Sequence, residues 1–388
     1  MPAGPDREYV AAASDARLAD DRLPPAPPIA APPTPGRFEV IDDRGLYLRE
    51  ISATGSSAID PTVPVTPPVP VTLYIHGLAG SSTNFDSLGT VLAGHTRGFS
   101  VDLPGFGRSD PPPGGRYSLA GDAELLAKLL DRISPDAPAQ VVGNSLGGMV
   151  ALALASRHPD RVSTLSLISP AVPDLRITTD RGADPRLAML LAPGTLSMAT
   201  RRLSSIGPVA RARGMAALCY GNPGVLTELD IETAAAELSW RFTLPWGHAA
   251  TVLALRSLMR SYLRAGRWSF RSAAARVTAP TLVVWGTKDR LVDAALAIPT
   301  AAAFTDHRLL VLPGLGHVAQ MEDPVTTGRA VLALWQDAAT GSTAPADQPA
   351  AAGKAAAAGE PAACGQAAPD RVGAPLTAAA VGVTPSCP

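Results

Sequence analysis

An alternation of short apolar runs with stretches of helical periodicity constrains this chain more than any other feature, and it extends from Phe38 to Leu312. Runs rich in β-branched residues that alternate with helical stretches favour a mostly parallel sheet with helices on both faces. We therefore expect an α/β fold in which flanking helices cover a mostly parallel, eight-stranded sheet. The expected strands are Phe38–Ile41, Leu46–Ile51, Val71–Ile75, Gly98–Val101, Gln140–Val142, Val162–Ile168, Thr281–Trp285 and His307–Leu312.

The alternation breaks once, between about residues 171 and 276, where no strand-like run occurs and helical periodicity dominates. We expect a helical domain there, inserted into a core formed by residues 37–170 and 277–339. The insertion contains 14 Arg, no Lys and 7 Asp or Glu residues, which gives it a formal charge of +7, whereas the whole chain carries −1. Positive charge is therefore concentrated in this part of the chain.

Three arginines of the insertion, Arg256, Arg260 and Arg264, recur every four residues and so share one face of an expected helix. Such a ridge would suit a substrate with a carboxylate or phosphate, or an anionic lipid surface. A solvated helix face in an arginine-rich composition explains the same spacing. Both interpretations stay open at this point.

Both ends of the chain lack the large apolar residues that a core needs. Residues 1–36 contain proline-rich runs and residues 340–388 consist largely of Ala, Gly and Pro, so we expect both segments to be disordered. The N-terminus has acidic residues where a signal peptide needs an apolar run. The three cysteines form neither a disulfide framework nor a metal-ligand spacing. We therefore expect a cytoplasmic protein.

The composition also excludes several classes of partner. A near-neutral chain offers nucleic acid no general electrostatic attraction, and no apolar stretch is long enough to span a bilayer. We expect no nucleic-acid partner and no stable membrane insertion, whereas the oligomeric state is not constrained. The sequence has no phosphate-binding glycine loop, dinucleotide fingerprint or metal-ligand cluster, so no cofactor and no metal are expected.

The strongest local signal is the segment Gly143-Asn-Ser-Leu-Gly147, which joins a strand-like run to the helix-like stretch Met149–Arg157. A serine on a tight strand-to-helix turn is lifted clear of the sheet edge, and small neighbours let the turn pack. The helix N-terminus also directs free N–H groups at the reacting oxygen. Ser145 is therefore the candidate nucleophile. The alternative is an ordinary glycine-rich connection with an incidental serine.

A serine nucleophile needs a base, and the base needs an acceptor that orients it. His317 follows the last expected strand in a glycine-rich loop, and Asp289 follows the strand before it, so both side chains should reach the same sheet edge. Asp289 could instead be a turn residue that bonds its own backbone, with Asp174 or Asp293 as the acid. The histidines in less suitable helix-end, insertion or strand-start positions are His95, His158, His248 and His307.

An acyl-transfer site also needs N–H donors for the developing oxyanion. The loop that begins at Gly77 follows another expected strand, and the residue after the candidate nucleophile opens a helix. We expect the backbone amides of Leu78 and Leu146 to form the oxyanion hole. The alternative is a tight loop that has no role in binding an oxyanion. His76 is expected to be a structural hydrogen-bonding residue of this loop rather than a second base.

These motifs resemble the capped α/β-hydrolase superfamily, and the resemblance covers about residues 37–339. The motifs appear in the family's order as His76-Gly77, Asp102–Ser109, Gly143–Gly148, Gly286–Asp289 and Gly316-His317. The resemblance implies that the insertion is a helical cap over the active site. A serine at the nucleophile position disfavours the related haloalkane dehalogenases and epoxide hydrolases, which have an aspartate there. The segment around Ser145 is similar to that of carbon–carbon bond hydrolases that cleave ring-fission products, and esterases share it.

The expected function is therefore hydrolysis of a small-molecule carboxylic ester, or a related acyl bond, through an acyl-enzyme on Ser145 with His317 and Asp289. Carbon–carbon bond hydrolysis of a vinylogous diketone is the alternative within the same resemblance, followed by cleavage of a thioester or lactone. A non-catalytic ligand-binding protein of the same fold is the alternative of another class. Substrate identity and acyl chain length lie beyond the sequence.

Overall fold

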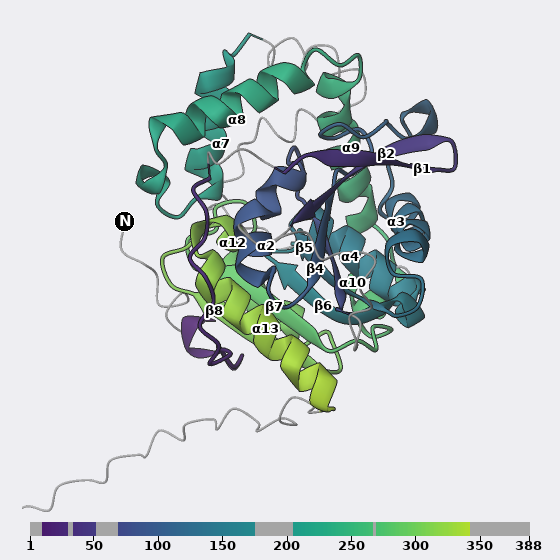
Figure 1. Ribbon diagram of the computed structural model, residues 1–388, viewed down its shortest axis with the longest axis vertical. Helices are drawn as coiled ribbons and strands as arrows, with labels where there is room; N and C mark the ends of the chain where they lie inside the picture. Colours follow the sequence, from purple (N-terminus) through teal and green to yellow (C-terminus); the bar gives the residue numbers. More distant parts are fainter. Residues whose placement is uncertain (1–9, 30–33, 52–68, 175–204, 267–268, 342–388) are drawn as a thin grey trace, which may run out of the picture. The chain divides into compact units, whose positions relative to one another are not determined.

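The computed structural model describes residues 10–29, 34–51, 69–174, 205–266 and 269–341, all within the compact unit Met1–Ala344. Eight strands form one sheet in the order β1-β2-β4-β3-β5-β6-β7-β8 (Figure 1). The strands β1 and β2 form an antiparallel hairpin, β2 is antiparallel to β4, and the other pairs are parallel. The strands are β1 Gly36–Ile41, β2 Arg44–Ile51, β3 Val71–Ile75, β4 Arg97–Val101, β5 Ala139–Asn144, β6 Val162–Ile168, β7 Thr281–Gly286 and β8 His307–Leu312.

The expected eight-stranded, mostly parallel sheet is thus confirmed, and its apolar strands have a clear cause. In β7, Val283 and Trp285 pack into one core cluster, whereas Leu282 and Val284 pack into a second cluster on the opposite face. Strands buried on both faces are apolar at consecutive positions rather than at alternate ones.

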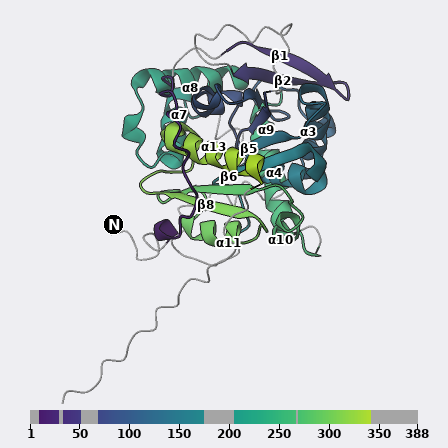
Figure 2. The same ribbon diagram turned by 60° about the horizontal axis from the view of Figure 1, so that its bottom comes forward.

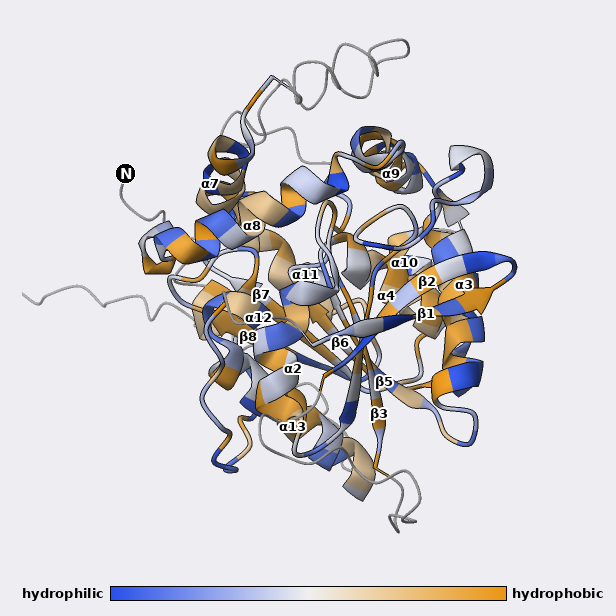
Figure 3. Ribbon diagram, turned by 45° about the horizontal axis from the view of Figure 1, so that its top comes forward, coloured by the Kyte–Doolittle hydropathy of each residue, from blue (hydrophilic) through white to orange (hydrophobic). Residues whose placement is uncertain are grey.

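Helices cover the sheet on both sides. Residues of α3, α4 and α11 belong to the first core cluster, and residues of α2 and α13 belong to the second. Figure 3 shows the amphipathic character of α3, whose hydrophobic and hydrophilic residues lie on different sides. The helices of the core are α2 Asp86–Leu92, α3 Leu119–Ile133, α4 Leu146–Arg157, α10 Phe270–Ala274, α11 Ala297–Ala301, α12 Ala319–Glu322 and α13 Pro324–Thr340.

The described residues of the insertion between β6 and β7 form helices joined by loops, and none of them belongs to a strand. The insertion contains α7 Pro208–Cys219, α8 Glu228–Arg241 and α9 Gly247–Tyr262, and it ends with α10, which packs on the core through Ala274. Residues 175–204 and 267–268 lie outside the described residues. Helices α7 and α8 form a small apolar cluster with Val318, which follows the last strand in the sequence, whereas α9 packs into the first core cluster. None of the described helices combines the length and the apolar character needed to cross a membrane.

The expected arginine ridge is only partly a free face. Arg256 is half-buried and takes part in an interaction, whereas Arg260 and Arg264 are exposed. Because α9 ends at Tyr262, Leu263 lies beyond the helix and is 83% exposed instead of continuing the buried face.

The expectation that residues 1–36 are disordered is wrong for residues 10–29, which follow the sheet edge at β8 and the neighbouring α13 (Figure 2). The amides of Asp15 and Ala16 donate to the carbonyl of Leu309 at 2.9 and 3.0 Å, and the Leu309 amide donates to the Asp15 carboxylate at 2.6 Å. Val10, Ala19 and Leu23 are buried. Apolar residues this sparse give no periodic signal, yet each can fill a gap beside an edge strand whose polar groups need partners. Residues 1–9, 30–33 and 342–388 lie outside the described residues.

This N-terminal segment should contribute measurably to stability. Leu23 is 8% exposed and packs into the second core cluster. Replacing a buried leucine by alanine loses transfer free energy and leaves a cavity, so Leu23→Ala should lower the free energy of unfolding by about 2–3 kcal/mol. Urea denaturation compares it with Arg22→Ala, which changes the exposed neighbouring residue. Equal small effects of the two substitutions would mean that the segment packs too loosely to stabilise the fold.

Candidate active site

The strand β5 passes into α4 through a single residue, Ser145, whose backbone has φ 55° and ψ −117°. A positive φ is uncommon for a residue with a side chain and persists only where the surroundings enforce it. Here the Ser145 amide donates to the carbonyl of Ile168 at 3.0 Å, and its carbonyl accepts from the amides of Met149 and Ala171 at 3.2 and 3.0 Å. Ser145 itself is half-buried, between buried neighbours on both sides. The turn therefore leaves the serine accessible at the carboxyl ends of β5 and β6.

Glycines around Ser145 are required because backbone segments approach closely. A Cβ atom at Gly147 would lie 2.2 Å from the carbonyl oxygen of Ile75, and one at Gly143 would lie 2.5 Å from the carbonyl oxygen of Gly147. A Cβ atom at Gly77 would lie 3.1 Å from that of Ser145. The loop after β3 therefore lies directly against the serine turn.

The structure brings His317 and Asp289 together as expected from the sequence. The Nδ1 atom of His317 lies 2.8 Å from Oδ2 of Asp289, and both residues are buried. The other carboxylate oxygen, Oδ1, accepts the amides of Leu291 and Val292 at 2.8 and 2.9 Å. Asp289 is thus both the turn residue and the partner of His317, whereas Asp293 caps a short 3-10 helix (Ala294–Leu296). With Nδ1 as donor, Nε2 of His317 is left as an acceptor.

Asn144 connects the serine turn to the loop that contains His317, which we call the histidine loop. Its Nδ2 donates to the carbonyl of Ile168 and to that of His317, both at 3.0 Å. One buried amide thus holds the end of β6 and the backbone of His317 beside Ser145. In the described part of the chain, no hydrogen bond joins the Ser145 hydroxyl to the His317 ring, and such bonds often form only when substrate is bound. The sequence indicated Asn144 only as part of a family motif.

The insertion also contacts the histidine loop through polar groups. The amide of His317 donates to the carbonyl of Cys219 at 2.6 Å. The carboxylate of Glu322 accepts the amide of Gly316 at 2.7 Å and that of Gly221 at 2.8 Å. Burial raises the pKa of this carboxyl group above its usual value. Glu322 was missed by sequence reasoning, because its partners are backbone amides, which no residue type marks, and one of them lies 101 positions away.

The loop after β3 contains a tight turn, Gly77–Gly80, which we call the oxyanion loop because the sequence predicts one of the two oxyanion donors there. The Gly80 amide donates to the Gly77 carbonyl at 3.0 Å, and His76 Nδ1 lies 2.7 Å from the same oxygen. Nε2 of His76 accepts the amide of Leu103 at 2.9 Å. Both ring nitrogens are therefore engaged, and His76 is the structural residue expected from the sequence.

The two amides expected to form an oxyanion hole belong to Leu78 and Leu146, the residues that follow Gly77 and Ser145, which lie in contact. Leu146 is the first residue of α4, where an amide has no acceptor within the helix. Leu78 is the second residue of the oxyanion loop, next to Gly77. Both residues are therefore close in the chain to Ser145 or to its contact with Gly77, and an oxyanion hole formed by their amides stays a prediction.

The buried His76 should make stability depend on pH. Burial lowers the pKa of His76 from 6.5 to about 4. The unfolded chain therefore takes up a proton below pH 6.5 that the folded chain binds only near pH 4, so folded stability falls as the pH falls through this window. We expect a loss of about 2 kcal/mol between pH 7 and pH 5. Urea unfolding at both values measures it, with His76→Gln as the comparison, and an equal loss in that variant would contradict the assignment.

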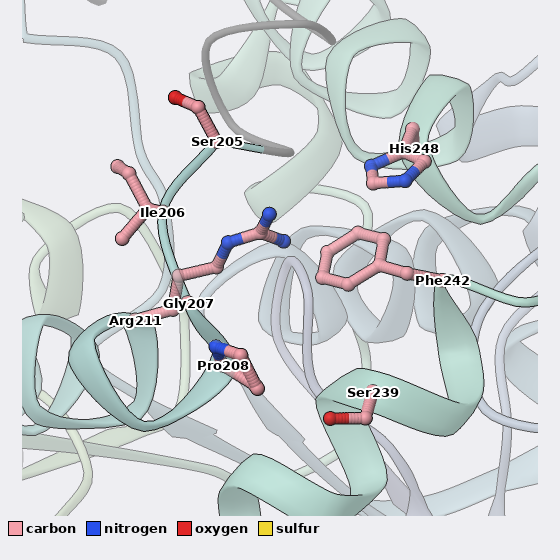
Figure 4. A pocket seen from close by; sticks show the side chains of 8 residues that line it. All are labelled: Ser205, Ile206, Gly207, Pro208, Arg211, Ser239, Phe242 and His248. Carbon is pink, nitrogen blue, oxygen red and sulfur yellow. The ribbon is translucent and has the colours of Figure 1, made fainter.

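A cavity of about 260 Å³ lies in the insertion, and none of the predicted site residues lines it. Arg211 stacks on the ring of Phe242 at 4.3 Å, and Phe242 stacks on His248 with the ring centres 4.1 Å apart (Figure 4). Across the described ranges, no three His, Cys, Asp or Glu side chains form a cluster that could hold a metal ion.

Comparison with known proteins agrees with the architecture. A sequence model of the alpha/beta hydrolase fold matches residues 70–192 and 232–324. An uncharacterized protein of Mycobacterium tuberculosis is 30% identical over 269 residues, which are 66% of this chain and 72% of that protein. A monoacylglycerol lipase of Rattus norvegicus is 24% identical over 273 residues, 68% of this chain and 74% of the lipase.

A solved structure shows the same fold at low sequence identity. The meta-cleavage product hydrolase of Pseudomonas fluorescens superimposes with a TM-score of 0.59 and 18% identity, over 78% of this chain and 98% of that one. The family match spans more than half of the chain and includes β3, the serine turn, and the loops of Asp289 and His317. The chain therefore belongs to the family of proteins with the α/β-hydrolase fold.

Proposed function

We propose that this protein is a serine hydrolase that cleaves a carboxylic ester through a triad of Ser145, His317 and Asp289. The observation that carries the proposal is the buried hydrogen bond of 2.8 Å between His317 and Asp289, in a loop that Asn144 holds beside the strained serine turn. An oriented imidazole with a free acceptor nitrogen next to a serine hydroxyl is the arrangement that nucleophilic acyl transfer needs.

The proposed reaction has two halves. Nε2 of His317 accepts the proton of the Ser145 hydroxyl as its oxygen bonds to the acyl carbon, and Asp289 stabilises the imidazolium. The amides of Leu78 and Leu146 donate to the oxyanion, the carbon–oxygen bond breaks, and the alcohol leaves with the proton from His317. Water then adds to the acyl-enzyme by the same steps, which releases the acid and restores the serine hydroxyl.

We further propose that the helices of the insertion form a cap over this site. The contacts of Cys219 and Gly221 with the histidine loop support this placement. A small-molecule acyl substrate fits the likeness to a monoacylglycerol lipase. Cleavage of a carbon–carbon bond is the second candidate, because the same triad and a fold shared with a meta-cleavage product hydrolase are compatible with it.

Covalent labelling tests the proposal directly. The intact protein is treated with a fluorophosphonate probe, and mass spectrometry with peptide mapping locates the adduct. We expect one adduct per chain, on Ser145, and none in Ser145→Ala. Turnover of neutral esters, anionic esters and a vinylogous diketone then separates ester from carbon–carbon cleavage. Absence of an adduct on folded protein would refute an activated serine and favour a ligand-binding role.

A further inference from the structure

The guanidinium group of Arg241, at the end of α8 in the insertion, lies buried against the oxyanion loop. It donates to two successive carbonyls, through Nη1 to Ala79 and through Nη2 to Gly80 at 3.0 Å. Arg241 is only 3% exposed. Ser239 and Phe242, on either side of it in the sequence, line the cavity of the insertion instead (Figure 4). The last turn of α8 therefore directs one charged side chain against the oxyanion loop.

One of the two carbonyls held by Arg241, that of Ala79, is linked to the orientation of the Leu78 amide. A peptide group is planar, so the direction of its carbonyl determines the direction of the N–H on the next residue. Arg241 holds the carbonyl of Ala79, and the same peptide group carries the Gly80 amide, which donates to the Gly77 carbonyl at 3.0 Å. The peptide group of the Gly77 carbonyl carries the Leu78 amide. The arginine thus constrains that amide through two peptide planes and one hydrogen bond.

The oxyanion loop needs an external constraint of this kind. Ala79 has φ 60°, a left-handed conformation that is unfavourable for a residue with a Cβ atom. Inversion of a peptide plane in this turn would relieve the strain and turn donors away from the serine. Two charge-assisted hydrogen bonds to consecutive carbonyls oppose that inversion, because either carbonyl would lose its partner.

Arg241 is itself held in place by its neighbours. Its Nη2 lies 3.4 Å from the carboxylate of Glu237, one turn earlier on α8, and Glu237 accepts the hydroxyl of Thr83 at 3.2 Å. Thr83 lies in the 3-10 helix Ser82–Phe85 that follows the oxyanion loop. The end of α8 is thus bonded both to the oxyanion loop and to the segment after it.

We propose that Arg241 is a positioning residue that keeps the oxyanion loop in the conformation in which the Leu78 amide faces Ser145. It would thereby couple the insertion to the oxyanion hole. This inference rests on the proposed serine hydrolase function. If it holds, loss of the guanidinium group weakens stabilisation of the tetrahedral intermediate without preventing substrate from binding. A side chain that only attached the insertion to the core would affect stability and substrate affinity instead.

The test compares Arg241→Met and Arg241→Lys with Arg213→Met, which removes an exposed arginine of α7 that pairs with Glu228. For an ester that the wild type hydrolyses, we expect Arg241→Met to lower kcat by about 10–100-fold, since loss of a whole oxyanion donor costs about 10²–10³-fold. KM should change less than threefold, and added guanidinium ion at millimolar concentration should restore part of kcat. The kcat of Arg241→Lys should lie between those of the wild type and Arg241→Met, because an ammonium group cannot hold two carbonyls as the planar guanidinium group does. Arg213→Met should retain wild-type kcat.

Inhibitor affinities provide the second readout. A trifluoromethyl ketone forms a tetrahedral adduct whose oxyanion needs the donors, whereas the matched alcohol does not. We expect Arg241→Met to lower the binding affinity for the ketone at least tenfold and that for the alcohol less than threefold. Equal weakening of both, or an unchanged kcat in folded protein, would overturn the proposal. If Arg241→Met does not fold, Arg241→Lys decides by the same criteria. Failure of the wild type to label on Ser145 would instead refute the hydrolase function itself.

Discussion

Replacing Ser145 by alanine is expected to lower kcat for ester hydrolysis by about 10⁶-fold, while the protein keeps its fold. The substitution removes a single oxygen from a half-buried position, so the turn retains its backbone hydrogen bonds to Ile168, Met149 and Ala171. Residual turnover above the rate in water would come from the oxyanion donors and from substrate binding. Steady-state kinetics at saturating ester, with active-site titration of the wild type, measures the loss.

Ser169→Ala is the matched control for this loss. Ser169 follows the neighbouring strand β6, is fully buried, and has a positive φ of 42°. Within the described part of the chain its hydroxyl has no hydrogen-bond partner, so removing the oxygen is expected to cost no interaction. We expect kcat within about twofold of the wild type. A Ser145→Ala variant that kept one-tenth of wild-type kcat would show that another nucleophile, or an activated water molecule, carries the reaction.

The sequence contained enough information to predict the layers of the fold and to name candidate residues for the site. Strands buried on both faces are apolar at nearly every position, so runs such as Val71–Ile75 could be identified without any alignment. The placement of Ser145, Asp289 and His317 at one edge of the sheet could be predicted because the loops after parallel strands meet at that edge. The structure joins Asp289 to His317 by a direct hydrogen bond, and the catalytic roles of all three residues stay predictions.

The contacts that hold the site could not be predicted in the same way. Asn144 bonds to a carbonyl 173 positions away, and Arg241 to one 162 positions away. The acceptors are backbone carbonyls, which every residue has, so no residue type marks the partner. The same holds for the N-terminal segment, where Asp15 bonds to the amide of Leu309. Local patterns specify elements, whereas such contacts depend on how the elements are placed in three dimensions.

Replacing Asp289 by asparagine is expected to lower kcat by about 10⁴-fold, a loss typical of a triad histidine held in the wrong tautomer. The Oδ1 position accepts the amides of Leu291 and Val292 at 2.8 and 2.9 Å, so the asparagine must place its carbonyl oxygen there. Its NH₂ group then faces Nδ1 of His317, where Oδ2 of Asp289 now lies at 2.8 Å. Two donors cannot share this contact, so Nδ1 becomes the acceptor and the ring proton moves to Nε2. The imidazole then has no free nitrogen with which to accept the serine proton.

Asp293→Asn separates this effect from a general loss of acidic side chains in the same loop. Asp293 accepts the amide of Ala295 at 3.0 Å as a helix cap, a bond that an asparagine oxygen also makes, so kcat should stay within about threefold. Both variants should unfold at urea concentrations close to that of the wild type, because each asparagine keeps the side-chain oxygen that accepts the backbone amides. Fluorophosphonate labelling of Asp289→Asn should slow in parallel with kcat, since both reactions need the same proton transfer. Full labelling with reduced turnover would place the defect in deacylation, and near-normal kcat would mean that His317 is oriented without Asp289.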